Sequence, residues 1–328
     1  MQVAIIGLGQ IGLLYDYEQK NKDIILSHAK AFWEHPSFEL VCGVDTNFEY
    51  REKFETKYHI PSYASIAEMM ENHTPEIVTI ATNTSTHFRV FSELAQFKLK
   101  AIFCEKPLAS NFHDANKMVE VSNNKNISLI VNFKRRFDPG IQKIKEVIIS
   151  NELGTVEKVV LFYGKGVLNN GSHLIDLLIY LFGMPNNYKI LKVHSYNKYE
   201  NDYDVDLTFF FDDFEVYMFA NNHKDYTLFE MDIIGQNGRI ILDAKEKETI
   251  NFYKKKEHEV FSGYTFLDSN ALSIKMEMDK YQFNAFNDLD KVLTENIDSV
   301  SSGENALLSL KLVDDIISSI SERMLNGK

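Results

Sequence analysis

Cysteine is scarce in this chain. Cys42 and Cys104 are the two that it contains, and both lie inside apolar runs typical of strands. Such settings indicate small buried hydrophobic side chains in a reducing compartment. Long apolar runs are missing as well: none approaches the roughly 18 residues that a membrane span needs, and no signal peptide precedes the first apolar run. We therefore expect a soluble, cytoplasmic protein with no membrane partner.

Positive charge is also in short supply. The chain has 35 Lys and Arg residues against 47 Asp and Glu residues, which gives a net charge of −12. Lys134–Arg136 is the one basic cluster, and it is short. This balance argues against nucleic acid or an anionic membrane surface as a partner. The ten histidines are scattered without the spacing of metal ligands, so we predict no metal site.

The length of 328 residues exceeds one ordinary hydrophobic core, so we expect two domains. Strand and helix signals alternate through residues 1–133. This alternation predicts right-handed crossovers and a doubly wound parallel sheet of the Rossmann type, covered by helices on both faces. The expected strands are 1–6, 38–44, 77–81, 101–104 and 127–131. The expected helices are 24–35, 48–58, 65–72, 86–97 and 110–123.

The rhythm changes in residues 134–328, which predict an α+β second domain within an α/β protein. From about residue 188 to residue 261 the pattern is strand after strand, typical of a large, mainly antiparallel open sheet. Aromatic-rich strands of this kind would suit a subunit interface if helices leave one sheet face uncovered. The expected helices are 139–150, with Asp138 as its N-cap, 172–182, 281–296 and 304–323.

The N-terminal strand runs directly into a glycine-rich turn, G-L-G-Q-I-G at residues 7–12. Gly7 permits the tight turn, Gly9 lets the backbone approach a pyrophosphate, and Gly12 lets the next helix pack close to the strand. The phosphates would then bind unpaired N–H groups at the positive end of that helix. The pattern predicts a dinucleotide site that also includes Gln10 and Ile11.

Asp45 ends the second expected strand, where a carboxylate can accept both hydroxyls of an adenosine ribose. It follows Gly9 by 36 residues, later than the roughly 20 typical of this fold. We attribute the excess to a polar insertion at Asp16–Asp23. Because Thr46 and Asn47 follow Asp45, no neighbouring base would neutralise a 2′-phosphate, and NAD is favoured over NADP. A solvated turn aspartate is the alternative interpretation.

Two strand exits carry further polar residues. After the strand 77–81, a loop with Ala81, Thr82, Asn83 and His87 either borders the cofactor or caps the helix that follows. After the strand 101–104 comes Glu105-Lys106-Pro107. Lys106 there could reach a substrate oxygen at the nicotinamide and stabilise developing alkoxide charge, whereas an ordinary turn would make it a surface ion pair.

A histidine opens the apolar helix expected at 172–182. His173 lies in its first turn, Asp176 follows three residues later on the same face, and Asn169 precedes the histidine by four residues. A histidine oriented by a carboxylate is the usual proton carrier between alcohol and ketone. A core or capping histidine is the alternative. Lys106 in the same chain favours the catalytic interpretation.

These motifs occur together and in a characteristic order. G-L-G-Q-I-G, the acid at Asp45, T-N-T-S-T-H, C-E-K-P, N-F-K-R-R-F-D-P and N-N-G-S-H-L-I-D-L follow one another along the chain. The sequence resembles the Gfo/Idh/MocA oxidoreductases over essentially its whole length.

The resemblance implies a Rossmann domain, 1–133, and a substrate-binding and oligomerisation domain, 134–328, whose open sheet forms homodimers or homotetramers. It implies Lys106 and His173 as the catalytic pair, and Glu105 and Lys106 beside the cofactor. Asn132 and Arg136 match the segment that borders the substrate. It also implies that the Lys106–Pro107 bond is cis, as in some relatives.

One departure from the family pattern concerns the proton chemistry. The family usually has aspartate where this chain has Asn169, which cannot accept a proton. The leading hypothesis is an NAD-dependent dehydrogenase or reductase for a secondary hydroxyl or ketone of a sugar, cyclitol or nucleotide-sugar. In it His173 and Lys106 act chemically, and Asn169 and Asp176 orient them. The alternatives are an enzyme that recycles tightly bound NAD for elimination, epimerisation or glycoside cleavage, and a catalytically silent NAD-binding sensor.

Overall fold

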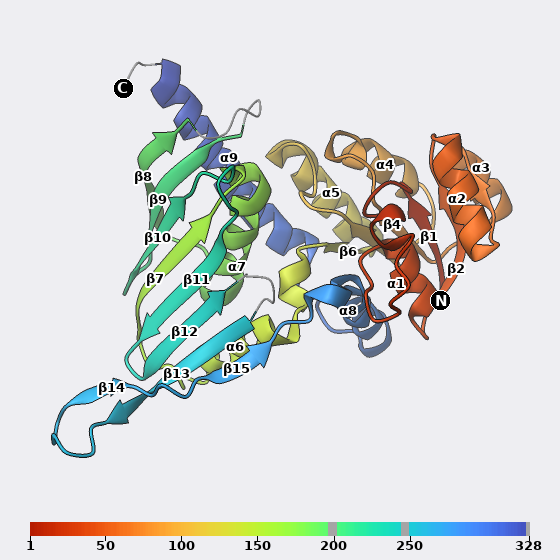
Figure 1. Cartoon of the computed structure of the whole chain (residues 1–328). Helices are drawn as coiled ribbons and strands as arrows, with labels where there is room; N and C mark the ends of the chain where they lie inside the picture. Colours follow the sequence, from red (N-terminus) through yellow and green to blue (C-terminus); the bar gives the residue numbers. More distant parts are fainter. Residues whose placement is uncertain (196–201, 244–248, 326–328) are drawn as a thin grey trace. The chain divides into compact units, whose positions relative to one another are not determined.

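The structure is a computed structural model that describes residues 1–195, 202–243 and 249–325 (Figure 1). The chain forms two compact units. The first contains Met1–Phe137 and Met278–Leu310, and the second contains Asp138–Glu277 and Lys311–Lys328. Within the described ranges, no helix combines the length and the apolar character needed to cross a membrane.

The first unit is built on a six-stranded parallel sheet in the order β3-β2-β1-β4-β5-β6. Its central strands are mostly apolar, because helices cover both faces of a parallel sheet. The predicted doubly wound sheet is confirmed. Its strands are β1 Gln2–Ile6, β2 Glu39–Val44, β3 Ser62–Tyr63, β4 Ile77–Ile80, β5 Ala101–Cys104 and β6 Ser128–Val131.

Alternate residues of each strand enter two separate cores. Val3 and Ile5 of β1 pack with α1, α2 and α8, while Ala4 and Ile6 pack with α3, α4, α5 and the start of α9. This period of two is what a strand buried on both faces requires. The helices are α1 His28–Glu34, α2 Phe48–Tyr58, α3 Ile66–Asn72, α4 His87–Leu94, α5 Phe112–Lys125, α8 Tyr281–Glu295 and α9 Gly303–Leu325.

Helix α8 comes from the far end of the chain and completes the first unit. Phe286 of α8 stacks on Phe32 of α1, with ring centroids 3.8 Å apart, and meets Phe103 of β5 edge-on at 5.2 Å. The sequence predicted this helix but placed every residue after 133 in the second domain. The apolar face of an amphipathic helix fits either sheet, so the helical pattern alone could not assign it.

The second unit is built on a nine-stranded sheet in the order β14-β13-β12-β11-β7-β10-β9-β8, with β15 also pairing with β13. All neighbours are antiparallel except β7 and β10, which confirms the mainly antiparallel prediction. The short β14 and β15 lie beyond the predicted strand region. The strands are β7 Val156–Tyr163, β8 Asn187–His194, β9 Asp204–Phe210, β10 Glu215–Ala220, β11 Phe229–Gly235, β12 Gly238–Asp243, β13 Thr249–Glu257, β14 Thr265–Leu267 and β15 Leu272–Lys275.

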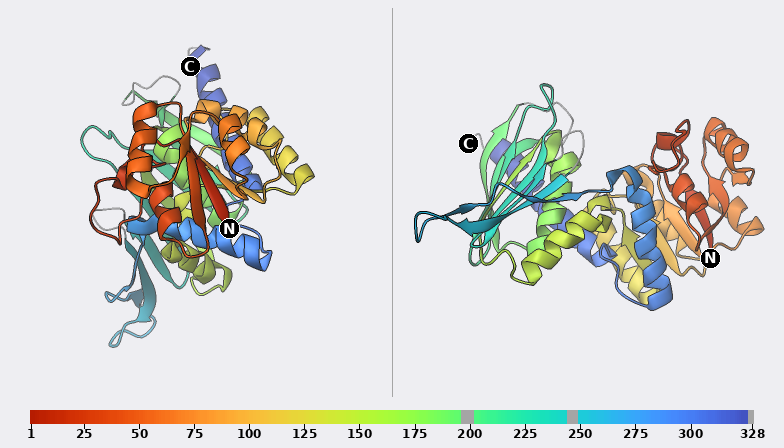
Figure 2. Two further views of the ribbon diagram at one scale, coloured as in Figure 1. Left: turned by 90° about the vertical axis from the view of Figure 1, so that its right-hand side faces the viewer. Right: turned by 60° about the horizontal axis from the view of Figure 1, so that its bottom comes forward.

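Helices cover one face of this sheet. α6 Pro139–Ile149, capped by Asp138 as predicted, and α7 Ser172–Phe182 lie on that face (Figures 1 and 2). No described helix of the unit lies over the other face in these views. Half-buried aromatic rings lie on that uncovered face: Phe219 is 5.9 Å from Phe162 and 6.4 Å from Tyr217.

The turn after β1 depends on two of its three glycines for steric reasons. Gly7 has φ +101°, and a Cβ there would lie 2.6 Å from the Ala81 carbonyl. A Cβ at Gly12 would lie 1.9 Å from the Gly7 carbonyl oxygen. A Cβ at Gly9 would meet no atom within 4 Å. Gly7 and Gly12 therefore close the turn, whereas Gly9 faces open space.

Gly9→Ala and Gly12→Ala should have different effects on the free energy of unfolding, measured with urea on the full chain. Gly12→Ala forces the backbone apart and should cost about 1–3 kcal/mol or more. Gly9→Ala should be neutral or stabilising by up to about 1 kcal/mol, because it removes only unfolded-chain entropy. Equal destabilisation by both substitutions would contradict this account of the turn.

Candidate active site

The first α-helix begins well after the glycine turn, inside the range 24–35 expected from the sequence. Leu13 N–H donates to the Gly9 carbonyl at 2.9 Å, a short 3-10 helix follows at Leu14–Asp16, and α1 begins at His28. The N–H groups of His28 and Ala29 donate to the carbonyls of Ile11 and Gly12, both at 3.0 Å. These two N–H groups at the start of α1 are therefore used within the chain, and the place of the phosphates stays a prediction.

The turn itself offers the free donors instead. In the part of the chain that the structure describes, the N–H groups of Gly9, Gln10 and Ile11 have no acceptor. Successive unpaired N–H groups in a turn form a concave site for an anion.

The predicted polar insertion explains the delayed helix. Asp16 is buried, and its Oδ2 accepts from the N–H groups of Leu26 at 2.7 Å and Ser27 at 2.9 Å. Ser27 in turn caps α1 by accepting from Lys30 N–H. One buried carboxylate thus holds both ends of the inserted segment.

A hollow of about 680 Å³ opens beside the turn. Most of the predicted cofactor residues border it. These are Gly7, Gly9, Gln10, Ile11, Asp45, Ala81, Thr82 and Asn83. The other four predicted residues, Gly12, His87, Glu105 and Lys106, are not among the residues that line it.

Asp45 is fixed at the rim of this hollow. Its Oδ2 accepts from Leu8 N–H at 2.7 Å and its Oδ1 from Asn47 N–H at 2.8 Å. The sequence did not point to Arg51, which lies in the first turn of α2 and donates from Nη1 to the Asp45 carbonyl at 2.8 Å. Nor did it point to Arg89, an exposed residue of α4 that borders the hollow.

The loop after β4 borders the hollow and does not cap α4 with a side chain. Thr86 Oγ1 donates to the Asn83 carbonyl at 2.8 Å, and no side chain caps the helix start. Of the two interpretations left open, the structure excludes the capping one. His87 is buried, and its ring nitrogens lie 3.0 Å from the carbonyl oxygens of Pro107 and Thr82. It joins the loops that follow β4 and β5.

The segment after β5 turns Glu105 inward and leaves Lys106 partly exposed. The Lys106–Pro107 bond is cis, as the resemblance implied. Glu105 and the predicted substrate residue Asn132 belong to one buried hydrogen-bond network, because Asn132 Nδ2 donates to Glu105 Oε1 at 2.7 Å. Arg136 is 2% exposed, and its Nη1 donates to the Val300 carbonyl at 3.1 Å. A substrate-binding role for Asn132 and Arg136 stays a prediction.

The predicted catalytic residues of the second unit lie at the start of α7. His173 and Asp176 are buried on this helix, and Asn169 is exposed in the π-helical turn Gly166–Gly171 that precedes it. Two aspartates hold that turn: Asp204 Oδ1 accepts from Gly166 N–H at 2.8 Å, and Asp202 Oδ1 accepts from Leu168 N–H at 2.9 Å.

Asp202 and Asp204 were missed because they lie far along the chain, at the start of β9. A Cβ at Gly166 would fall 2.1 Å from Asp202 Oδ2, so this carboxylate packs directly on the glycine. Burial raises the pKa of Asp202 despite the N–H groups that donate to it. The pair sets the backbone that leads to His173.

The two cysteines behave as predicted for buried thiols. Both are free and buried. Burial raises the pKa of Cys42 to about 12 and the pKa of Cys104 well above its usual value. Neither thiol is activated as a nucleophile.

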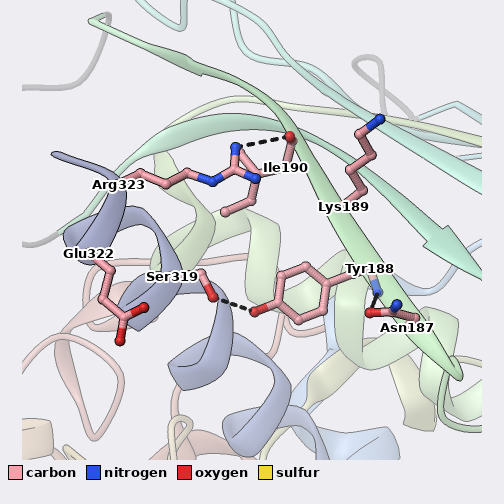
Figure 3. Close-up of a pocket in the computed structure, with 7 residues that line it drawn as sticks. All are labelled: Asn187, Tyr188, Lys189, Ile190, Ser319, Glu322 and Arg323. Atoms are coloured by element: carbon pink, nitrogen blue, oxygen red, sulfur yellow. Dashed lines mark hydrogen bonds between the residues drawn. The ribbon is translucent and has the colours of Figure 1, made fainter. Parts of the chain in front are cut away.

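A second hollow, of about 730 Å³, lies between β8 and the end of α9 (Figure 3). Tyr188 Oη and Ser319 Oγ are 2.8 Å apart there, and Arg323 Nη1 donates to the Ile190 carbonyl at 3.1 Å. None of the predicted site residues lines it.

Known proteins share this combination of units. Residues 1–133 match the Gfo/Idh/MocA family described as "Oxidoreductase family, NAD-binding Rossmann fold", and residues 164–326 match its "C-terminal alpha/beta domain". A curated relative, myo-inositol 2-dehydrogenase of Thermotoga maritima, is 29% identical over 154 residues. That alignment covers 47% of this chain and 42% of the relative, so it spans less than half of either.

Solved structures share the fold across nearly the whole chain. The WlbA dehydrogenase of Bordetella pertussis, solved with NADH and UDP-GlcNAcA, superposes with a TM-score of 0.77 at 17% identity and covers 98% of this chain and 96% of that one. The UDP-N-acetylglucosamine 3-dehydrogenase GnnA of Acidithiobacillus ferrooxidans gives 0.76 at 15% identity and 96% of both chains. With both units matched in order, this chain belongs to the Gfo/Idh/MocA family of NAD-binding oxidoreductases.

Proposed function

We propose that this chain binds NAD in the hollow beside the glycine turn and moves a hydride between that cofactor and a secondary hydroxyl or ketone. The substrate class is a sugar, cyclitol or nucleotide-sugar. The observation that carries the proposal is the set of unpaired N–H groups at Gly9, Gln10 and Ile11 beside the fixed Asp45 carboxylate. The names of relatives with inositol and UDP-sugar substrates support the substrate class.

The residues present fit a dinucleotide. The free N–H groups of the turn would bind the pyrophosphate, the open space at Gly9 would admit it, and Asp45 would accept the ribose hydroxyls. The bound NAD supplies the redox chemistry, and the protein supplies binding and orientation. Asp45 would repel a 2′-phosphate, which favours NAD. Arg89 borders the hollow without an acidic partner in the described residues, so NADP remains the alternative.

The chemical step is assigned to His173 and Lys106. In this proposal His173 exchanges the proton of the substrate hydroxyl, and Lys106 stabilises negative charge on the same oxygen. Asn169 and Asp176 orient them, since an asparagine cannot accept the proton. Both alternatives from the sequence also bind NAD. One is an enzyme that recycles its NAD within one turnover, and the other is a sensor that transfers no hydride. A cytoplasmic location likewise stays a prediction of the sequence.

Asp45→Ala should change the choice of cofactor. Without the carboxylate, NAD loses its ribose acceptor and NADP loses a repulsive charge, so the ratio of the NADP and NAD dissociation constants should fall by about tenfold or more. Fluorescence titration with NADH and NADPH measures both constants. Preference for NADPH in the unchanged protein would overturn the assignment of NAD.

Lys106→Ala and His173→Ala should each lower turnover by a factor of about 10² or more, with the dissociation constant of NADH nearly unchanged. Absorbance at the reduced-nicotinamide band, with a panel of inositols, sugars and UDP-sugars, measures turnover. Tightly bound NAD with no net NADH formed would favour the recycling alternative. Binding without hydride transfer to any member of the panel would favour the sensor.

We further propose that the uncovered sheet face of the second unit joins copies of this chain into a homodimer or homotetramer. Its half-buried rings at Phe162, Tyr217 and Phe219 favour such a contact. Phe219→Asp should then shift the molar mass in sedimentation equilibrium towards that of the monomer, while Tyr264→Asp, on an exposed loop, should not. An unchanged mass for Phe219→Asp would contradict the interface.

A further inference from the structure

A buried network of polar side chains surrounds Glu105, the residue that precedes Lys106. Glu105 leaves β5 with its side chain 13% exposed, and its Oε1 accepts two hydrogen bonds. His28 Nε2 of α1 lies 2.7 Å away, and Asn132 Nδ2 after β6 also lies 2.7 Å away. Gln282 Oε1 of α8 accepts from Asn132 Nδ2 at 2.9 Å, and Gln282 Nε2 lies 3.2 Å from His28 Nε2. Four elements of the first unit thus meet at one carboxylate.

The surroundings of His28 decide where its hydrogen lies. The residue is 0% exposed, and its ring lies 5.7 Å from the Phe103 ring and 5.8 Å from the Phe286 ring. Its Nδ1 is buried without a hydrogen-bond partner. A hydrogen on Nδ1 would be an unpaired buried donor, which is costly. His28 Nε2 therefore carries a hydrogen, which it donates to Glu105 Oε1.

The carboxylate in turn is ionised. Burial by itself would raise the pKa of Glu105, but the hydrogen bond from His28 and the interaction with its charge, the hydrogen bond from Asn132 and the charge of Lys106 lower it below its usual value. Tyr281 and Cys104 also interact with the Glu105 charge, and both are uncharged near neutral pH. The Glu105 charge and burial raise the pKa of both Tyr281 on α8 and Cys104 on β5. The positive charge of Lys106 interacts favourably with the Glu105 carboxylate.

We propose that His28 is a positioning residue that fixes the ionised Glu105 carboxylate and, through it, keeps the Lys106 side chain protonated and in place. This inference deepens the proposed function, since it concerns the residue assigned to stabilise the substrate oxygen. His28 also reaches the cofactor side, because its N–H donates to the Ile11 carbonyl of the glycine turn. One residue would then connect the phosphate-binding turn with the lysine.

The test compares His28→Gln with His28→Leu in the full chain. A glutamine amide can replace Nε2–H as a donor to Glu105, whereas leucine cannot. The readout is the rate at which an amine-acylating reagent modifies Lys106 as a function of pH, followed by peptide mass spectrometry without substrate. The midpoint should be unchanged in His28→Gln and about one pH unit lower in His28→Leu, a tenfold change in the protonation constant.

Two controls keep the result specific. His35 is another buried histidine of the first unit, bonded to Asn287 instead of Glu105, so His35→Leu should leave the Lys106 midpoint unchanged. Glu105→Gln should lower the midpoint as His28→Leu does, and the double variant should show no additional shift, because both act through one charge.

Equal midpoints in the unchanged protein, His28→Leu and Glu105→Gln would overturn the proposal. A shift in Glu105→Gln alone would assign the charge to Glu105 but overturn the role of His28. If His28→Leu does not fold, as judged by circular dichroism, His28→Gln and Glu105→Gln still test the proposal. An equal shift of the Lys106 midpoint in both variants would overturn it, and so would an unchanged midpoint in Glu105→Gln. Because the labelling needs no substrate, failure to find an oxidisable sugar would contradict the proposed function without affecting this result.

Discussion

The carbonyls of Ile11 and Gly12 accept hydrogen bonds from the first N–H groups of α1. These two hydrogen bonds determine which backbone N–H groups near the glycine turn stay unpaired. They satisfy the start of the helix from within the chain, so the donors left for an anion are those of the turn. The same contact sets His28 at the base of the helix, with its ring on Glu105. A turn, a helix start and the residue next to Lys106 therefore depend on one short stretch of backbone.

Local patterns predicted much of this architecture. An apolar strand before Gly7, an acid at the end of β2 and alternating strands and helices suffice for a parallel sheet, because crossover rules leave few other topologies. The same rules place the loops after β4 and β5 at the carboxyl edge of the sheet. The glycine turn, Asp45 and the loop after β4, which border the hollow, were accordingly found from the sequence, whereas Tyr15, Tyr50, Arg89 and other residues that line it were not.

Long-range pairings could not be predicted in this way. His28 and Glu105 are 77 residues apart, and neither position carries a periodic signal that points to the other. Asp202 packs on Gly166 from a different strand, and α8 returns to the first unit after the whole second sheet. The buried role of Asp16 was missed for a related reason, because the composition of its segment indicates a solvated loop.

A crystal structure of this protein grown with NAD tests the central claim most directly. The account predicts the pyrophosphate on the N–H groups of Gly9, Gln10 and Ile11, with the adenosine ribose at Asp45 and Glu105 still bonded to His28. A dinucleotide bound elsewhere, for example in the hollow between β8 and α9, would contradict it.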